Sequence, residues 1–272
     1  VHGPWKYEGT EKHYAYYNAS DSMLHSEFGN DGMANLRTLK KILSKKNLKV
    51  TTVSENSVWR HHGEWWDTYR YRDRELFGEM EDLSDYIAVS QYMEGEGLRY
   101  ASESNRRRVW RNSGSIVWQP NEPWPNTSCT CVTDYYMRPK LAYYFCRDAY
   151  AARHISLKYN KLIYKPGENF TAEIFVHNDM RSAVFEVLCE IKSQTGETLA
   201  YFKRTVQVGE NRADIQGTVS ACVPEGSVFY AECELKTGEQ RFKNRYMYFI
   251  TKSSDEKLAI EPVKQFIAEY KK

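Results

Sequence analysis

Long hydrophobic runs are missing from this sequence of 272 residues. No stretch approaches the ~18 consecutive apolar residues that a membrane-spanning helix needs, and no charged-then-apolar leader opens the chain. We therefore expect no membrane partner. The start at Val1 rather than at methionine suggests a trimmed or excised segment.

An excess of one charge sign is also missing. The chain has 38 Lys and Arg against 36 Asp and Glu, for a formal net charge of +2. A nucleic-acid binder normally carries a basic face or tail. The near balance therefore predicts no nucleic-acid partner.

Cysteine is scarce, with six in the whole chain, which is too few for a disulfide scaffold. No CxxC pair or Cys/His spacing suggests zinc, so we expect neither a metal site nor a cofactor. Cys189 and Cys233 fall in the apolar phase of expected strands, as core thiols or as one bridge. His61 and His62 stand near Glu64, but adjacent side chains diverge and do not readily chelate one ion.

Aromatic residues are abundant, at 14% of the chain with seven Trp and 21 Tyr. Flat rings offer stacking surfaces to sugars, although most aromatic side chains simply fill cores. The abundance is compatible with a carbohydrate site and does not by itself establish one.

The most informative stretch is residues 23–30, a short apolar run that ends in Glu27, Phe28 and Gly29. Such a run predicts a buried strand, and parallel barrel strands carry their catalytic groups at the carboxyl end. Glu27 therefore stands where a barrel enzyme places a catalytic carboxylate. A structural ion pair at a strand end is an equally good interpretation of the local residues alone.

The segments around this stretch predict a mixture of loops and helices. Residues 1–17 are aromatic but lack periodicity, and we expect a long loop there. Apolar residues at helical spacing predict an amphipathic helix over 33–44. A longer helix is expected from a Ser84 cap to about Arg111, its small residues packing closely and its arginines 106–108 solvated.

A second short apolar strand is expected over 115–118, followed by a proline-locked loop at 119–125. Strand, helix and strand in this order make the βαβ unit of a parallel sheet. Pro139 then opens a further helix with apolar residues at helical intervals.

From His154 onward the hydrophobic period changes from 3.6 to 2. Turn residues recur between alternating segments, and about seven short strands at this spacing predict an immunoglobulin-like sandwich of ~100 residues. The last residues, 253–272, predict an amphipathic helix that tolerates Pro262 only near its start.

Three motifs carry a family likeness: VHGPW at 1–5, HSEFG at 25–29 and VWQPNEPWP at 117–125. In order and spacing they resemble the last third of the catalytic barrel of glycoside hydrolase family 2. The β-mannosidase branch and the related exo-β-glucosaminidases are the most similar, over about residues 1–250.

This resemblance implies the fold class α/β plus all-β. Residues 1–152 would be the carboxyl-terminal third of a (β/α)8 TIM barrel, 153–251 an immunoglobulin-like β-sandwich, and 252–272 a tail. It implies a retaining exo-β-glycosidase that hydrolyses terminal β-linked sugars, with no cofactor.

By the same resemblance, Glu27 matches the nucleophile at the end of the seventh barrel strand. Trp118 matches the tryptophan that flanks the bound sugar, and His2, Trp5 and Asn121 are assigned to substrate contacts. Glu122 would look like an acid beside Glu27, but the family's proton donor lies on the fourth strand, so a loop-fixing role is preferred.

The resemblance therefore implies an acid/base upstream of Val1, with the remainder of its own polypeptide as a partner and a β-mannoside or related β-glycoside as substrate. We expect these residues alone not to turn over substrate. A periplasmic, secreted or lysosomal location suits the family. The alternative is a non-catalytic carbohydrate-binding or scaffolding module built on the sandwich.

Overall fold

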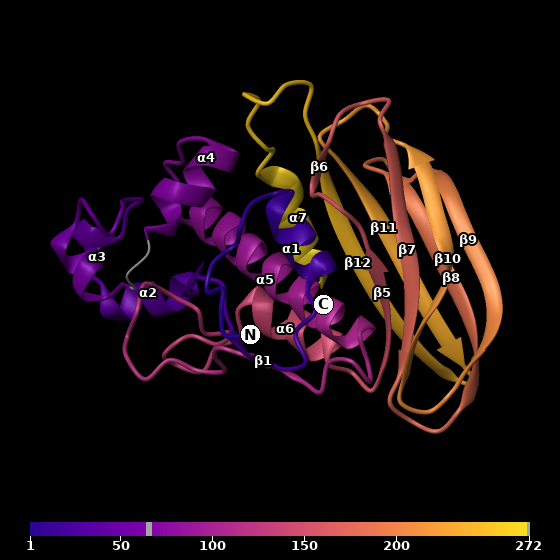
Figure 1. Ribbon diagram of the computed structural model, residues 1–272. Coiled ribbons are helices and arrows are strands. Elements are labelled where there is room, and N and C mark those ends of the chain that lie inside the picture. Colours follow the sequence, from indigo (N-terminus) through magenta and orange to yellow (C-terminus); the bar gives the residue numbers. More distant parts are fainter. Residues whose placement is uncertain (64–66, 271–272) are drawn as a thin grey trace.

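The structure of the chain is a computed structural model that describes residues 1–63 and 67–270. Helices dominate its first half and long strands its second, and the two parts lie against each other (Figure 1). The helices are α1 (Lys12–Ala19), α2 (Leu36–Ile42), α3 (Ser57–His61), α4 (Arg74–Phe77), α5 (Leu83–Arg107), α6 (Leu141–Ala149) and α7 (Glu261–Tyr270), with a 3-10 turn at Lys45–Asn47 and a π-helical turn at Tyr69–Asp73.

The strands of the first half are short. They are β1 (His25–Phe28), β2 (Gly32–Met33), β3 (Ser115–Val117) and β4 (Ser128–Cys129). β1 pairs with β3 in parallel, and on its other side Glu27 forms a parallel bridge with His2. The strands expected within 23–30 and at 115–118 are therefore confirmed. The described residues therefore form a parallel ladder of three segments around Glu27. They do not form a closed barrel.

The long helix α5 lies between the two halves, and it confirms the expected helix with different ends. The Asp82 carboxylate caps it by accepting the Ser84 backbone N–H at 2.7 Å, so the expected Ser84 cap is corrected by two residues. Its small residues do pack closely: a Cβ on Gly97 would lie 2.7 Å from Asn30 Nδ2. The Ser90 hydroxyl accepts the backbone N–H of Met33 in β2 at 3.2 Å.

The segment expected as a loop over 1–17 instead contains the helix α1, and the expectation was wrong there. Tyr14 and Tyr17 are buried, and the Tyr14 ring meets Tyr100 of α5 with 4.7 Å between centroids. The Tyr14 hydroxyl donates to Glu96 at 3.2 Å, so its polar end is satisfied. Packing on α5 therefore forms a helix that shows no apolar stripe in its sequence.

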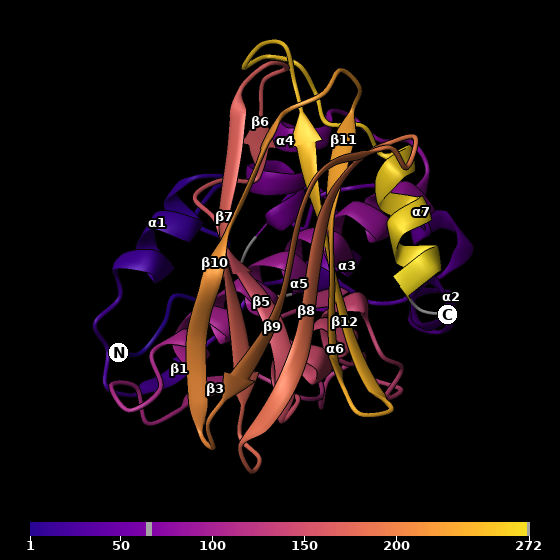
Figure 2. The same ribbon diagram turned by 90° about the vertical axis from the view of Figure 1, so that its right-hand side faces the viewer.

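The second half forms two sheets that cover the helices from one side (Figure 2). One sheet has the order β10-β7-β5 and the other β6-β12-β11-β8-β9. The strands are β5 (Arg153–Lys158), β6 (Ile163–Tyr164), β7 (Asn169–Asn178), β8 (Ala183–Ser193), β9 (Thr198–Val208), β10 (Arg212–Cys222), β11 (Val228–Thr237) and β12 (Gln240–Ile250).

The two sheets share one apolar interior. Phe170 of β7 contacts Phe229 of β11 and Tyr248 of β12, with ring centroids 5.2 and 4.7 Å apart. Cys189 and Cys233 are opposite each other on β8 and β11 as free thiols, with their sulfur atoms 3.1 Å apart. The alternation predicted from His154 onward thus produces two packed, mostly antiparallel layers.

The helix expected in the tail is confirmed as α7, with Pro262 in its first turn. Phe266 is buried and stacks on Tyr230 of β11 with 6.4 Å between centroids. Its ring also meets Tyr92 of α5 at 5.8 Å. The end of the chain therefore packs against both halves. Within the described residues no helix is long and apolar enough to cross a membrane.

Candidate active site

Glu27 lies on the central strand of the parallel ladder, one residue before its carboxyl end. Its backbone carbonyl accepts the Gly3 N–H at 2.7 Å, which fixes the segment carrying His2 beside it. On the other side the Trp118 N–H donates to the Phe28 carbonyl at 2.7 Å. The ladder therefore brings the three family-like motifs, far apart in the sequence, onto neighbouring strands.

The Glu27 carboxylate keeps 22% of its side-chain surface exposed and has a defined donor. The indole N–H of Trp5 donates to Oε1 at 2.7 Å. His2 is more exposed, and its Nε2 lies 3.9 Å from Oε2. Trp5 binds one oxygen, and the other lies on the side of His2, where no hydrogen bond to it is present among the described residues.

Trp118 follows β3, and the residue is 43% exposed. Its backbone runs so close to β1 that a Cβ on Gly29 would lie 2.7 Å from the Trp118 carbonyl oxygen. The same Cβ would meet Trp5 Cδ1 at 3.2 Å. A glycine two residues after Glu27 is therefore required for the two tryptophans to approach the strand end.

A cavity of about 250 Å³ adjoins Trp5 and is lined by charged groups that include Glu8, Asp31, Asp67 and Arg72. Burial raises the pKa of the Asp31 carboxyl to about 6, against the lowering effect of Lys140 and Arg72. Trp5 thus connects the Glu27 carboxylate to a polar hollow. The motifs in the sequence gave no indication of Asp31, because its raised pKa results from burial.

Buried cations hold the chain that follows β1. The Arg72 guanidinium donates to the Asn30 side chain at 3.1 Å and to the Asp31 carbonyl at 2.8 Å. Lys140 Nζ donates to the Gly32 carbonyl at 3.0 Å and pairs with Glu94 at 2.6 Å. These bonds fix the backbone directly after the candidate catalytic strand.

Glu94 itself is an unusual group, fully buried on α5. Burial raises the pKa of its carboxyl to about 8, although the neighbouring Lys140 opposes that change. A Cβ on Gly32 would lie 2.2 Å from a Glu94 carboxylate oxygen, so the glycine is needed for this close approach. The ion pair of Glu94 with Lys140 therefore connects α5 to β2, because Lys140 also donates to the Gly32 carbonyl.

His25 positions the ladder from behind. Its Nε2 bonds to the Gly3 carbonyl at 2.8 Å and its Nδ1 to the Asn105 side chain at 3.1 Å. Burial lowers the pKa of the imidazole, with the Gly3 bond acting in the opposite direction. The histidine next to the apolar run thus connects the first segment, β1 and α5.

The other predicted site residues are placed differently. Asn121 is exposed, and no side-chain hydrogen bond to it is present among the described residues. Glu122 is 7% exposed, with Oε1 accepting the Trp124 N–H at 3.1 Å and Oε2 lying 3.3 Å from the Cys131 sulfur. These contacts fit the loop-fixing role preferred for Glu122.

The histidine pair diverges, with ring planes at 80° and centroids 5.0 Å apart. His62 Nδ1 bonds to the Pro125 carbonyl at 2.9 Å, while Glu64 lies outside the described residues. The pair therefore supports the loop that contains Pro125.

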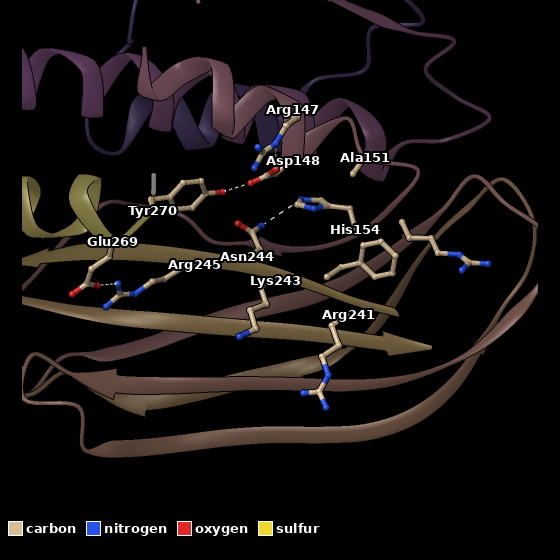
Figure 3. A pocket seen from close by; sticks show the side chains of 12 residues that line it. Arg147, Asp148, Ala151, His154, Arg241, Lys243, Asn244, Arg245, Glu269 and Tyr270 are labelled. Atoms are coloured by element: carbon tan, nitrogen blue, oxygen red, sulfur yellow. Dashed lines mark hydrogen bonds and ion pairs between the residues drawn. The ribbon is translucent and has the colours of Figure 1, made fainter. Parts of the chain in front are cut away.

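A larger cavity, of about 470 Å³, lies between α6, α7 and β12, on the sheet side of the molecule (Figure 3). Two ion pairs lie within its lining, Arg147 with Asp148 at 2.7 Å and Arg245 with Glu269. Neither Glu27 nor either site tryptophan lines it. This cavity is separate from the candidate site.

A carboxylate on a parallel strand ladder, flanked by tryptophans and joined to two packed sheets, is the arrangement that the resemblance to family 2 glycosidases implies. No model of a known protein family matches the chain. It is 23% identical over 247 residues to the exo-β-D-glucosaminidase of Arthroderma benhamiae, covering 85% of this chain and 26% of that enzyme. It is 27% identical over 146 residues to β-mannosidase B of Aspergillus niger, covering 51% and 17%.

Solved structures give the same result for the fold. The β-D-mannosidase of Dictyoglomus thermophilum has a TM-score of 0.67 at 22% identity, covering 90% of this chain and 29% of that one. The exo-chitosanase of Amycolatopsis orientalis has a TM-score of 0.69 at 19% identity, covering 90% and 30%. These similarities confirm the resemblance to the carboxyl-terminal part of β-mannosidase-like glycosidases. The chain spans between a sixth and a third of the length of these four relatives.

Proposed function

We propose that this chain is the carboxyl-terminal portion of a retaining exo-β-glycosidase, with a β-mannoside as the favoured substrate class and Glu27 as the nucleophile. The observation that carries the proposal is the partly exposed Glu27 carboxylate on the ladder, with Trp5 bound to one oxygen at 2.7 Å. The names of the relatives, β-mannosidase and exo-β-glucosaminidase, support the reaction class.

In the first step, the free oxygen of Glu27 attacks the anomeric carbon while the bond to the leaving oxygen breaks. A general acid protonates the leaving oxygen, and a covalent glycosyl ester remains on Glu27. In the second step, water attacks the same carbon, the acid's conjugate base takes its proton, and the ester bond breaks. The sugar is released with its anomeric configuration retained.

Trp5 has two tasks in this proposal. Its N–H donates to Oε1, which orients the carboxylate for attack by Oε2. Its ring also lines the cavity of about 250 Å³. Trp118 and His2 would contact the sugar from the flanking strands, and Asn121 from the exposed loop.

The general acid is proposed to lie upstream of these residues. Retaining hydrolysis needs two carboxyl groups ~5–5.5 Å apart. Glu122 is unsuited to the role because it is buried and both of its oxygens have partners, Oε1 in the Trp124 N–H of its own loop and Oε2 in the Cys131 sulfur. We therefore expect residues 1–272 alone to be inactive, and the first part of the barrel to supply the acid and complete the sheet.

The direct test is covalent labelling of the full-length protein with a 2-deoxy-2-fluoro-β-mannosyl fluoride. The fluorine slows the second step, so the proposal expects one sugar per chain, attached to the peptide that contains Glu27. Glu27→Gln should abolish labelling and reduce kcat/KM by at least about 1000-fold, the scale seen when a covalent nucleophile is removed.

The matched control is Glu225→Gln, at an exposed glutamate on the turn between β10 and β11. It should label and turn over as the unchanged protein does. Labelling at another carboxylate, or full activity of Glu27→Gln, would contradict the assignment. An aryl β-glucosaminide assayed in parallel separates the two substrate classes named by the relatives.

The alternative is a non-catalytic carbohydrate-binding or scaffolding module on the two sheets. The described strands show no row of exposed rings that would support it. The rings Phe170, Phe229 and Tyr248 lie inside, and Tyr201 is the exposed aromatic residue of the described strands β5–β12. Glycan binding that survives Glu27→Gln and Trp118→Ala but is lost with Tyr201→Ala would favour it.

A further inference from the structure

Three side chains with metal-binding atoms come together in the segment that follows β3. They are Glu122 in the loop, Cys129 at the end of β4 and Cys131 two residues later. One carboxylate oxygen and the two sulfur atoms all lie within 4.8 Å of one another. The residues are 7%, 1% and 0% exposed. Sequence spacing did not predict this cluster, because Cys-x-Cys is not a usual zinc pair and Glu122 comes from a separate turn.

The distances are close to those of a tetrahedral metal site. Zinc bonds of ~2.3 Å to sulfur and ~2.0–2.2 Å to oxygen put neighbouring ligand atoms roughly 3.5–3.8 Å apart. The Cys131 sulfur is already 3.3 Å from Glu122 Oε2. Closure of the cluster around an ion therefore needs side-chain shifts on the order of 1 Å, without refolding of the segment.

Paired backbone presents these ligands. Cys129 pairs with Gly32 between β4 and β2, and the Gln119 N–H donates to the Thr130 carbonyl at 3.1 Å. The Trp124 N–H holds Glu122 Oε1 at 3.1 Å, which leaves Oε2 directed to the sulfur of Cys131. Bonds of this kind to the second oxygen orient a carboxylate for a metal.

The donor set selects the class of ion. Two thiolates with one carboxylate suit zinc and related thiophilic ions, whereas magnesium and calcium prefer oxygen alone. Two thiolates and a carboxylate carry three negative charges, so a divalent ion leaves one. The buried ammonium of Lys140 lies 3.9 Å from the Cys129 sulfur and attracts that remaining charge, and it shares its own charge with Glu94 at 2.6 Å.

We propose that Glu122, Cys129 and Cys131 bind one zinc ion, with the fourth position filled by water or another small donor. The ion would join the 119–125 loop to β4. It would thereby fix the chain that leaves Trp118, and it has no chemical step of its own. This proposal is independent of the glycosidase proposal, because metal binding is measured without substrate.

The test uses full-length protein, reduced and freed of metal, and then given zinc alone or cobalt alone. We expect about one zinc per chain after dialysis, and with cobalt the intense near-ultraviolet absorption of thiolate-to-cobalt charge transfer. Cys129→Ser and Cys131→Ser should each lose that absorption. Cys146→Ser, at a buried cysteine outside the cluster, and Cys222→Ser, at an exposed one, should retain it.

X-ray absorption on the unsubstituted zinc protein gives a second measurement in case the cysteine variants do not fold. Two sulfur neighbours with oxygen or nitrogen neighbours would support the site. Failure of the reduced protein to retain zinc or cobalt would overturn the proposal. Retention unchanged in Cys129→Ser and Cys131→Ser would overturn it too. A Cys129–Cys131 disulfide, with no metal uptake after its reduction, would assign the pair to redox chemistry instead.

Discussion

Trp5 is the residue on which the geometry around Glu27 depends most directly, because its indole N–H is the hydrogen-bond donor within 3 Å of that carboxylate among the described side chains. A hydrogen bond to a charged group contributes about 1.5–3 kcal/mol. Its loss would free the carboxylate to rotate away from the orientation needed for attack.

We predict that Trp5→Phe, which keeps a ring but removes the N–H, lowers kcat/KM of the full-length enzyme by roughly 10- to 100-fold. The fluorinated sugar should form the glycosyl-enzyme more slowly, but labelling should still reach one sugar per chain. The measurement is the rate of labelling followed by mass spectrometry.

Trp110→Phe is the matched control, at a tryptophan that is 74% exposed after α5. It should label at the rate of the unchanged protein. If Trp5→Phe labels equally fast, the hydrogen bond at 2.7 Å does not orient the nucleophile.

At the residue scale the sequence revealed the groups that belong to contiguous motifs and missed those that depend on burial. Glu27 was indicated by its place at a strand end and Trp118 by the family resemblance, and both lie on the ladder as neighbours. Asp31, Arg72 and the cysteine cluster were not indicated. Their properties come from partners 40 or more residues away or from a turn, which local periodicity does not report.

At the scale of elements, α5 carries four buried charged side chains, those of Glu94, Glu96, Arg99 and Glu103. Glu103 is fully buried and accepts hydrogen bonds from His154 at 2.8 Å, from Asn244 at 2.9 Å and from Tyr246 at 2.9 Å. Figure 3 shows His154 and Asn244 directed toward each other at the edge of the cavity between α6, α7 and β12. This carboxylate therefore attaches α5 to the sheets.

The pKa of Glu103 determines how that attachment responds to acid. Burial alone raises it, but the hydrogen bond and charge of His154, with Arg99 and Arg107, lower it overall below its ordinary value of 4.5. A carboxyl with a lower pKa in the folded state stabilises the fold above the unfolded-state pKa. That stabilisation is lost as the pH falls through the folded-state value.

We predict that Glu103→Gln reduces the free energy of unfolding by about 3–5 kcal/mol at pH 7, because it leaves buried partners of a charge unmatched. The difference from the unchanged protein should shrink as the pH falls below about 4. Urea unfolding of both proteins at several pH values measures this.

The control for this prediction is Glu173→Gln, which breaks a half-exposed pair with Lys158 at 3.0 Å on the sheet. It should cost less than about 1 kcal/mol at any pH. An equal loss for Glu103→Gln and Glu173→Gln would show that the buried network contributes no special stability.

The arginines 106–108 illustrate why element contacts escape prediction. Their expected solvation was wrong: Arg106 donates to the Ala151 carbonyl at 2.9 Å and pairs with Asp179 at 2.9 Å, and Arg108 donates to the Ser22 carbonyl at 2.8 Å. A charged run at a helix end is usually exposed. Here α5 ends where three other segments converge, and only the three-dimensional arrangement reveals them.

At the scale of the whole molecule, α7 connects the end of the chain to both halves. Phe266 is 1% exposed and contacts Phe145 of α6, Tyr92 of α5 and Tyr230 of β11. Lys264 adds an ion pair at 2.8 Å to Asp85 in the first turn of α5. The helix therefore closes one side of the interface between the helical part and the sheets.

We predict that Phe266→Ala lowers the free energy of unfolding by about 3–5 kcal/mol, since it empties a buried aromatic site. Hydrogen exchange should increase first in α7 and in the facing part of α5. Tyr201→Ala, at a side chain that is 70% exposed on β9, should change the stability by less than about 0.5 kcal/mol. If hydrogen exchange in α5 is the same in Phe266→Ala as in the unchanged protein, this arrangement is contradicted.

The change from a helical half to a half made of strands followed from the change in hydrophobic period near His154, and the tail helix followed from its apolar spacing, whereas α1 was missed. Their docking did not follow, because α5 meets the sheets through polar groups as well as through rings such as Tyr92 and Phe249. Glu96 pairs with Arg99 and also accepts from Tyr159, and such contacts carry no hydrophobic pattern. Hydrophobic periodicity identifies helices and strands by their apolar faces, and it does not report polar contacts between them.

The 25 residues of α5 form a rod roughly 37 Å long. Gly97 abuts Asn30, two residues after the end of β1, while Glu103, less than two turns further on, is hydrogen-bonded to β5 and β12. A rod that stiff transmits displacement with little loss. If Trp5→Phe lowers turnover, random mutagenesis that selects for restored turnover should therefore recover compensating substitutions on the distant sheets as well as beside the bound sugar.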